Sequence, residues 1–358
     1  MPPPKPILIY RLGSLGDTVI ALPCFHLVRK LFPDRPVILL TNEPISGKAA
    51  PAMAILENSG LCDGVISYPV GTRSIQRLAR LRAQLRELQP EMVVNLAAAR
   101  GLLKSARDYW FFRSCGVKRI IGTPFKKRDL SVELLETGKY EAESQRLAAR
   151  LLPLGPIDLA DQANWTLMLT PEERRTGSEY VAGHSNFIAV SLGTKLYVNE
   201  WGENNWAELL RLLGGELPGT SLVLLGAGDE REKCERLGRV WRGRFLNLCG
   251  QTPPRISAAV LEHARLFIGH NSGPMHLAST LGIPTMGLFS WYNPPGQWFP
   301  GHPGWKRLRI LYPPLPSGGW QAGLQMKNGP GEGIQLLKPD DVFRSAMELW
   351  RTHSDQPA

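Results

Sequence analysis

The stretch Leu266-Phe-Ile-Gly-His-Asn-Ser-Gly-Pro-Met-His-Leu-Ala-Ser-Thr-Leu-Gly282 decides the fold class, because it passes from a strand through a turn into a helix. Its first three residues are apolar, as is typical of a buried strand. The run breaks at Gly269, and a helical pattern restarts at Pro274 with Ser272 or Gly273 as the cap. Backbone N–H groups at such a helix start have no intrahelical partner and lie at the positive end of the helix dipole. The turn can therefore seat a phosphate or a diphosphate.

The turn by itself does not decide between a structural and a functional role. Strand–turn–helix units occur in every α/β protein, and most of them bind no ligand. His276 lies one helical turn beyond the cap. The sequence predicts that its side chain adds a donor beside an anion seated there.

Apolar runs of strand length alternate with helical patterns along the whole chain of 358 residues. This alternation is typical of parallel sheets with helices on both faces. Strands are predicted at residues 6–12, 36–41, 64–69, 92–97, 119–122, 187–191, 221–226, 266–269 and 285–289. Helices are predicted at residues 18–32, 74–88, 102–115, 141–152, 206–213, 231–241, 256–263, 274–281 and 338–353.

The length and an interruption of the pattern at residues 169–186 predict two Rossmann-like domains with parallel sheets. A cleft between two such sheets faces the C-terminal strand ends, where open α/β sheets bind ligands. The stretch 291–333 is rich in Pro, Gly and Trp and is expected to be ordered but irregular loop. The predicted division is a first domain at 1–170, a linker at 171–186, a second domain at 187–337, and a C-terminal helical segment at 338–358 that returns across the seam.

Basic residues are concentrated in the first third of the chain. Residues 1–128 contain 20 Lys and Arg against 8 Asp and Glu, whereas the whole chain contains 42 against 32. This asymmetry indicates an anionic partner on one half of the protein, and nucleic acid, an anionic membrane surface and an anionic substrate all fit. A merely solvated basic face fits the charge equally well.

Several classes of protein are not favoured by the sequence. No apolar stretch has the length of a bilayer span, and the first residues lack the apolar core of a signal peptide. The five cysteines are scattered without CxxC spacing, so neither a disulfide framework nor a zinc site is expected. No HExxH or GxSxG pattern is present. We expect a cytoplasmic protein without a metal site.

The first predicted strand ends in Arg11-Leu-Gly-Ser-Leu-Gly-Asp17, where glycines allow the backbone to approach a ligand closely. The spacing is GxxG and no Lys-Ser/Thr pair follows, so neither a dinucleotide fingerprint nor a P-loop fits. Asp17 lies where a helix begins. It is either an acid favoured by the helix dipole or a carboxylate that accepts a proton from an attacking hydroxyl.

Two further polar turns follow strands in the second half. Ser191-Leu-Gly-Thr-Lys195 places Thr194, Lys195 and backbone amides where they can meet phosphate oxygens. Gly226-Ala-Gly-Asp-Glu230 places Glu230 where an acid holds ribose or base hydroxyls in nucleotide-binding folds. Each signal is weak alone, but their occurrence at several strand ends of one domain indicates a nucleotide ligand.

In their order and over nearly the full length, these motifs resemble glycosyltransferase family 9, the ADP-heptose:lipopolysaccharide heptosyltransferases. Ile7-Leu-Ile-Tyr-Arg-Leu-Gly-Ser-Leu-Gly-Asp-Thr18 is similar to the family's opening strand and its RxxSxGD turn. Gly269-His-Asn-Ser-Gly-Pro-Met-His-Leu-Ala278 is similar to its (D/N)(S/T)GPMHLA signature. Shorter elements at 138–141 and 247–250 lie where the family has similar ones. The resemblance implies the GT-B fold, in which two Rossmann-like domains face a central cleft, with no cofactor and no metal.

The resemblance also implies an inverting sugar transfer and assigns roles to individual residues. Asp17 would be the general base that deprotonates the acceptor hydroxyl while the diphosphate leaves. Ser272, Gly273 and His276 would hold the diphosphate of ADP, and Glu230 would contact the nucleoside. The expected donor-binding residues are Thr194, Lys195, Glu230, Asn271, Ser272, Gly273 and His276.

The acceptor is expected on the basic first domain, with Ser14, Gly16, Arg73 and Arg100 as binding residues. An anionic lipopolysaccharide core at the cytoplasmic face of the inner membrane fits this charge. The sequence therefore predicts a cytoplasmic enzyme with peripheral membrane association.

Two positions depart from the family pattern. Asn271 stands where family members usually have Asp, which would remove a carboxylate contact to the donor sugar. Asn199 stands two residues before Trp201, where a Lys is often found, and Lys195 lies nearby as a substitute. Both changes concern the identity of the donor sugar more than the class of reaction.

Three other functions stay open from the sequence. One is a nucleotide-sugar-binding homologue that has lost transfer activity, which Asn271 supports. Another is a family member that uses a different donor sugar. The third is a nucleic-acid-binding protein that uses the basic first third, although no helix-turn-helix or RNP motif is present.

Overall fold

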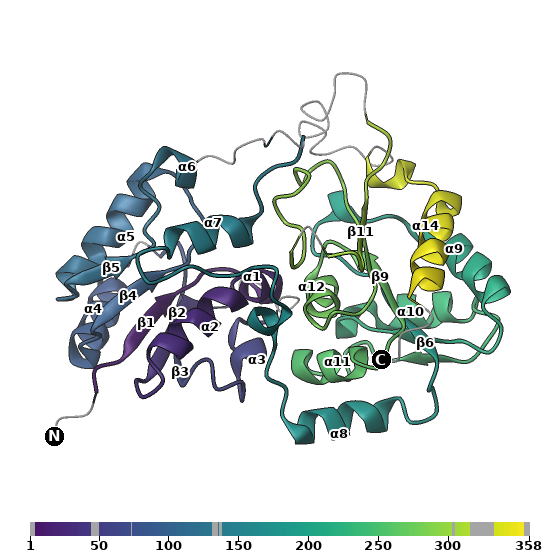
Figure 1. Ribbon diagram of the computed structural model, residues 1–358, viewed down its shortest axis with the longest axis horizontal. Coiled ribbons are helices and arrows are strands. Elements are labelled where there is room, and N and C mark those ends of the chain that lie inside the picture. Colours follow the sequence, from purple (N-terminus) through teal and green to yellow (C-terminus); the bar gives the residue numbers. More distant parts are fainter. Residues whose placement is uncertain are drawn as a thin grey trace. The chain divides into compact units, whose positions relative to one another are not determined.

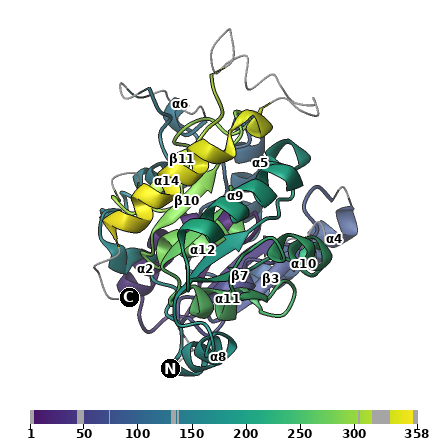
Figure 2. The same ribbon diagram turned by 90° about the vertical axis from the view of Figure 1, so that its right-hand side faces the viewer.

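A computed structural model describes residues 4–43, 50–72, 74–130, 135, 138–302, 305–315 and 333–353. Its contacts divide the chain into two compact units, Met1–Met168 and Leu169–Ala358. In each unit a parallel sheet is covered by helices on both faces (Figure 1; Figure 2 gives a second view). The predicted α/β fold class is confirmed.

The sheet of the first unit has five parallel strands in the order β3-β2-β1-β4-β5. The central strand is apolar and buried along its whole length, as expected for a strand covered on both faces. Chain order reverses between β1 and β4, and ligands of open α/β sheets bind beyond the carboxyl ends of the strands at such a point. The strands are β1 Ile7–Tyr10, β2 Val37–Asn42, β3 Gly64–Tyr68, β4 Met92–Asn95 and β5 Arg119–Ile121.

The helices of the first unit follow the predicted pattern with one main difference. A single helix is predicted at 18–32, but the structure has α1 and α2, joined at Ala21. Pro23 lacks an N–H and could not donate to Val19 in a continuous helix, so the chain bends and restarts with Pro23 in the first turn of α2. The helices are α1 Leu15–Ile20, α2 Leu22–Leu31, α3 Met53–Leu56, α4 Ile75–Leu88, α5 Leu102–Ser114, α6 Lys127–Leu130, α7 Glu143–Arg150 and the 3₁₀ helix η1 Gln162–Trp165.

The sheet of the second unit has six parallel strands in the order β11-β10-β9-β6-β7-β8. Its reversal of chain order lies between β6 and β9, so the turns after these two strands are neighbours. The strands are β6 Phe187–Ser191, β7 Ser221–Leu224, β8 Phe245–Asn247, β9 Leu266–His270, β10 Thr285–Leu288 and β11 Leu308–Leu311.

The helices of the second unit include α8, Pro171–Tyr180, in the stretch predicted as a linker. The remaining helical elements are η2 Tyr197–Asn199, α9 Glu203–Glu216, η3 Gly228–Glu230, α10 Arg231–Gly238, α11 Pro254–Leu261, α12 Gly273–Thr280, η4 Ile334–Leu336 and α14 Pro339–Thr352. The C-terminal helix α14 contacts α9, β9 and β11 of its own unit, and its apolar face joins the core of that unit.

Helix α8, Pro171–Tyr180, packs against α11. Its start is a capping box in which Thr170 and Glu173 exchange hydrogen bonds, Thr170 N–H to Glu173 Oε2 at 2.8 Å and Glu173 N–H to Thr170 Oγ at 3.2 Å. Glu173 also accepts two hydrogen bonds from the buried guanidinium of Arg255 on α11, at 2.6 and 2.7 Å. A Cβ at Gly177 would lie 2.5 Å from the Cβ of Ala259, so the two helices touch backbone to backbone at this point.

The prediction that 291–333 is irregular throughout is wrong at residues 308–311. Strand β11 pairs in parallel with β10 at the edge of the second sheet, in register from Thr285 against Leu308 to Leu288 against Leu311. The strand is short and only partly buried, so it lacks the continuous apolar run by which the buried strands were recognised. In the described part of the chain no helix has both the length and the apolar character needed to cross a membrane.

Candidate functional site

In the first unit, the turn between β1 and α1 fixes one oxygen of the Asp17 carboxylate. Asp17 is the third residue of α1, with Ser14 as the N-cap. Its Oδ2 accepts hydrogen bonds from the Ser14 backbone N–H at 2.8 Å and from the Ser14 hydroxyl at 3.1 Å. The side chain is 29% exposed. The carboxylate therefore fulfils the helix-start role and still presents part of its surface to solvent, so the structural and catalytic readings are compatible.

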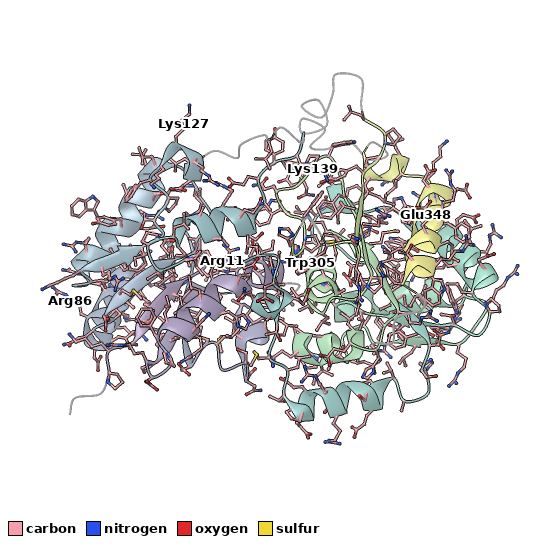
Figure 3. The ribbon with its side chains drawn as sticks, in the orientation of Figure 1. Arg11, Arg86, Lys127, Lys139, Trp305 and Glu348 are labelled. Atoms are coloured by element: carbon pink, nitrogen blue, oxygen red, sulfur yellow. The ribbon has the colours of Figure 1, made fainter. Side chains whose placement is uncertain are left out.

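Arg11 lies beneath this turn and is fully buried. Its Nη2 donates to the backbone carbonyl of Asp17 at 2.6 Å and lies 3.8 Å from Oδ1 of the same residue. Its Nη1 donates to the carbonyl of Leu96, just beyond β4, at 2.5 Å. Arg11 thus ties the turn after β1 to the end of the neighbouring strand; Figure 3 labels it in the first unit. It holds the backbone of Asp17 in place, and the Asp17 side chain remains 29% exposed.

Gly13 makes room for the Asp17 side chain. It has a φ of +131°, and a Cβ there would lie 2.5 Å from both Cβ and Cγ of Asp17. Its N–H donates to Oδ1 of Asn42, the last residue of β2, at 2.7 Å. Any side chain at position 13 would strain the backbone and displace the carboxylate.

The predicted acceptor-binding residues of the first unit lie in different surroundings. Ser14 and Gly16 lie in the first turn of α1, and the Ser14 hydroxyl orients Asp17. Arg100 donates to Asp108 at 2.6 Å and to the Tyr10 hydroxyl at 3.3 Å, so it is hydrogen-bonded within the unit. Arg73 lies outside the described residues.

In the second unit, the turns after β6 and β7 form a cradle for the Glu230 carboxylate. A Cβ at Gly193 would lie 1.6 Å from Glu230 Oε1, and one at Gly226 would lie 2.2 Å from Oε2. The Ala227 N–H donates to Oε2 at 3.0 Å. Burial raises the pKa of the Glu230 carboxyl. The carboxylate is therefore held between two strand ends where only glycine fits.

His270, the last residue of β9, joins the turns around this cradle. It is fully buried, its Nε2 lies 3.1 Å from the Trp201 N–H and its Nδ1 lies 3.3 Å from the Gly193 carbonyl. The Trp201 N–H must donate, so Nε2 is the acceptor and Nδ1 carries the proton that points to Gly193. Burial lowers the pKa of His270 to about 3, which keeps the ring neutral. The neutral His270 ring thus connects the turn after β6 with the start of α9 through two hydrogen bonds.

The turn after β9 begins helix α12 with Ser272 as the N-cap. Ser272 Oγ is buried and has no hydrogen-bond partner among the described residues. Asn271 is half-buried, and its N–H donates to the Leu288 carbonyl at 3.3 Å. His276 lies one turn later and is buried beside this start. A hydroxyl without a partner at a helix N-terminus matches the predicted anion seat.

The remaining predicted donor residues lie close by in the chain. Thr194 is half-buried and Lys195 is exposed, both directly after Gly193. Asn199, at the position where a Lys is often found, is buried, and its Oδ1 accepts from Ser290 Oγ at 2.5 Å and from Asn293 Nδ2 at 3.1 Å. Asn199 therefore connects η2 to the loop after β10.

Sequence reasoning missed four residues that shape the two turns, and their signals are identifiable. Arg11 and His270 are polar residues at the ends of apolar strands, a place where a buried partner network is expected. Gly13 was noted only as permissive and Gly193 only as part of a polar turn, whereas each faces a carboxylate from a residue farther along the chain. Among the described residues, no group of three or more His, Cys, Asp or Glu side chains is placed to hold a metal ion.

Comparison with known proteins gives the fold and the family of the chain. The structure of the glycosyl transferase family 9 protein from Veillonella parvula superposes with a TM-score of 0.74 at 17% identity, covering 98% of this chain and 99% of that chain. That of E. coli heptosyltransferase WaaC with ADP-2-deoxy-2-fluoro heptose superposes with a TM-score of 0.58 at 17% identity, covering 96% and 99%. Lipopolysaccharide core heptosyltransferase OpsX of Haemophilus influenzae is 20% identical over 304 residues, 81% of this chain and 80% of OpsX.

These matches define the fold class as GT-B, with two parallel-sheet α/β domains. The family model described as glycosyltransferase family 9 (heptosyltransferase) matches residues 78–305. The chain belongs to glycosyltransferase family 9, and the resemblance seen in the sequence is confirmed.

Proposed function

We propose that this chain transfers heptose from ADP-heptose to a lipopolysaccharide core acceptor with inversion at the anomeric carbon. The single observation that carries the proposal is Asp17: one carboxylate oxygen is fixed by two hydrogen bonds from Ser14 while the side chain stays 29% exposed. A carboxylate held in this way can receive a proton without changing its orientation. Family membership and the lipopolysaccharide core activity in the name of OpsX support the same reaction.

In this proposal the second unit holds the donor. The N–H groups at the start of α12 and the Ser272 hydroxyl receive the diphosphate, together with His276, and Glu230 receives the ribose hydroxyls. Thr194 and Lys195 lie after the adjacent strand and add contacts to phosphate oxygens. The ADP-sugar in the name of the WaaC structure supports an adenine nucleotide as donor.

The first unit supplies the base and the acceptor surface. The acceptor hydroxyl oxygen forms a bond to the anomeric carbon, the bond from that carbon to the diphosphate oxygen breaks, and the hydroxyl proton passes to Asp17. Fixed donors at the α12 start meet the charge that develops on the leaving diphosphate, so no resident metal is required. We place this reaction in the cytoplasm at the inner face of the membrane, where the acceptor's lipid lies.

A second candidate is the same reaction with another sugar on the nucleotide. Asn271 favours it, because an amide at this position offers both a donor and an acceptor where family members usually have a carboxylate. The two candidates share the leaving group and the base and differ only in the sugar.

The test is a transfer assay with the purified full chain. ADP-heptose and heptose-deficient lipopolysaccharide core are mixed with the protein, ADP release and product mass are followed, and NMR reports the anomeric configuration of the product. We expect acceptor-dependent ADP release, an inverted product and unchanged rates in EDTA. If only another nucleotide sugar is consumed, the second candidate is correct. Tight ADP binding without turnover of any donor would contradict both.

A further inference from the structure

Helix α5 of the first unit has apolar residues on the side where a surface helix normally has polar ones. Leu103 is 87% exposed and Trp110 is 67% exposed. These two residues are seven positions apart, two helical turns, so they lie on the same side of the helix. The inward side carries Ser105, Asp108 and Phe112, all buried. Leu103 and Trp110 lie outside because these three residues hold the buried positions of the helix.

The inward polar residues explain why α5 cannot be rotated to bury its apolar side. Asp108 accepts hydrogen bonds from Arg100 at 2.6 Å and from Arg107 at 2.8 and 3.1 Å, and the Tyr10 hydroxyl lies 3.5 Å away. Burial raises the pKa of Tyr10, whose hydroxyl also lies 2.9 Å from that of Tyr68. Rotation of α5 would separate this buried carboxylate from Tyr10 and Arg100, which lie outside the helix, and losing these partners is costly. The outward direction of Leu103 and Trp110 is thus a stable property of the fold.

A second apolar residue group continues this surface beyond the helix. The ring of Phe125 packs edge-to-face on Tyr109 of α5 at a centroid distance of 5.5 Å, and Phe125 remains 42% exposed. Leu102, beside Leu103, is 54% exposed. We call the exposed set Leu102, Leu103, Trp110 and Phe125 the α5 ridge. Exposed apolar residues grouped in this way mark a surface that meets a partner.

The α5 helix and its neighbours α4 and α6 carry many exposed cations. Helix α4 covers the same face of the sheet as α5. The connections β3–α4–β4 and β4–α5–β5 both run in the same direction along the strand order, and right-handed crossovers in the same direction place their helices on the same face. The two helices are joined by a hydrogen bond from Arg82 Nε to the Ser114 carbonyl at 3.1 Å. Figure 3 shows Arg86 of α4 and Lys127 of α6 extending outward from this unit. The exposed basic residues of α4, α5 and α6 are Arg77, Arg80, Arg82, Arg86, Lys104, Arg107, Arg113, Lys127 and Arg128.

We propose that the α5 ridge and its basic surroundings dock on an anionic lipid bilayer. Trp at the level of the lipid headgroups, aliphatic side chains below it and Lys or Arg around them are the features of an interfacial membrane surface. Phosphate-rich nucleic acid would use the cations but would leave a leucine as exposed as Leu103 without a contact. A bilayer uses both properties at once, and the proposal rests on the first unit alone.

The test is co-sedimentation of the full chain with vesicles of phosphatidylcholine alone or of phosphatidylcholine with one quarter phosphatidylglycerol. We expect the protein to bind the anionic vesicles at least tenfold more tightly than the neutral ones. A Leu103→Ser/Trp110→Ser double variant should lose about tenfold or more in partitioning. An Arg80→Gln/Lys127→Gln double variant should lose about 25-fold on anionic vesicles, since each cation near such a surface contributes about fivefold.

Matched controls separate the surface from general properties of the protein. Leu152→Ser removes an apolar residue that is 61% exposed outside the ridge, and Arg344→Gln/Arg351→Gln removes two exposed cations of α14 in the other unit. Both should bind vesicles like the wild type, and circular dichroism should show all variants folded with similar melting temperatures.

Three results would overturn the proposal. The first is wild-type binding that does not depend on phosphatidylglycerol, and the second is unchanged binding by folded ridge variants. The third is a wild-type dimer in light scattering that the Leu103→Ser/Trp110→Ser variant converts to a monomer without any effect on vesicles. Vesicle binding and sugar transfer are measured separately, so either can fail without the other.

Discussion

The substitution Gly193→Ala tests the cradle that holds Glu230 more sharply than removal of the carboxylate itself. The added Cβ would lie 1.6 Å from Glu230 Oε1, 2.0 Å from Cδ and 2.3 Å from Oε2, so all three nearest atoms belong to this one side chain. Gly193 has no φ in the left-handed region, so alanine fits the backbone. The perturbation is therefore a displacement of the Glu230 carboxylate and little else.

The size of the effect follows from the distances. Ordinary contact for a Cβ begins at 3.4 Å, so Oε1 must move by about 1.8 Å. Oε2, which accepts the 3.0 Å hydrogen bond from the Ala227 N–H, must itself move by about 1.1 Å from its 2.3 Å distance to the new Cβ. The shift therefore breaks that hydrogen bond and removes the carboxylate from the position where we propose it meets the ribose. A hydrogen bond to a charged group contributes about 1.5–3 kcal/mol. We expect ADP to bind about 10- to 150-fold more weakly.

The assay is isothermal titration with ADP, accompanied by thermal unfolding. The control is Gly215→Ala, the same chemical change on α9, where the nearest atom to the new Cβ is Arg242 Nη1 at 3.9 Å. Gly215→Ala should leave ADP binding unchanged and stabilise the protein by about 0.5–1 kcal/mol, since Gly is unfavourable inside a helix.

A double-mutant cycle identifies the cause. In a Glu230→Ala background the side chain that clashes is gone, so Gly193→Ala should have almost no further effect on ADP binding. The reasoning is refuted if Gly193→Ala binds ADP like the wild type, or if it is as harmful in the Glu230→Ala background as in the wild type.

Two further predictions concern stability. His270 stays neutral in the folded protein, because burial lowers its pKa from 6.5 to about 3, but it takes up a proton when unfolded. Between these two pKa values the unfolded state binds more protons than the folded state, so the free energy of unfolding should fall by about 1.4 kcal/mol per pH unit as the pH drops from 6.5 toward 3. Urea unfolding of His270→Asn should lack this pH-dependent loss of stability. An identical pH slope in the variant and the wild type would contradict the prediction. Gly177→Ala should destabilise the protein by about 1–3 kcal/mol in the same assay, because the new Cβ would lie 2.5 Å from that of Ala259 and force α8 away from α11. The same loss in Gly215→Ala would show that the packing of α8 is not the cause.

The fold class could be predicted from the sequence because buried parallel strands consist of continuous apolar runs of residues. Ile7-Leu-Ile-Tyr10 and Phe187-Ile-Ala-Val-Ser191 are recognisable without any partner strand. Strands β8 and β11 were missed because they are short and partly exposed. Helix α8 was predicted as a linker because Thr170-Pro-Glu-Glu and Gly183-His-Ser-Asn interrupt the alternating pattern. Its packing on α11 depends on a glycine and a buried ion pair that only the structure brings together.

The candidate site was predictable where the role of a residue depends on neighbours in the same turn of the chain. Asp17 and Ser272 lie at helix starts, and local chemistry indicates what they do. Glu230 and His270 were harder, because their partners lie at the ends of other strands, and a sequence pattern does not show which strands are neighbours. Arg100 was assigned to the acceptor from charge alone, and its salt bridge to the buried Asp108 could not be seen from the sequence.

The most direct test of the central claim, that Asp17 is the general base, is the kcat of Asp17→Asn in the transfer assay. The amide oxygen can still accept the hydrogen bonds that Oδ2 receives from Ser14, so the turn should keep its shape. We expect kcat to fall about 10²- to 10⁴-fold, with ADP affinity unchanged because the donor residues lie in the other unit. Asp34→Asn, at an exposed position of the same unit, should retain full activity. A folded Asp17→Asn variant with near wild-type kcat would contradict the assignment.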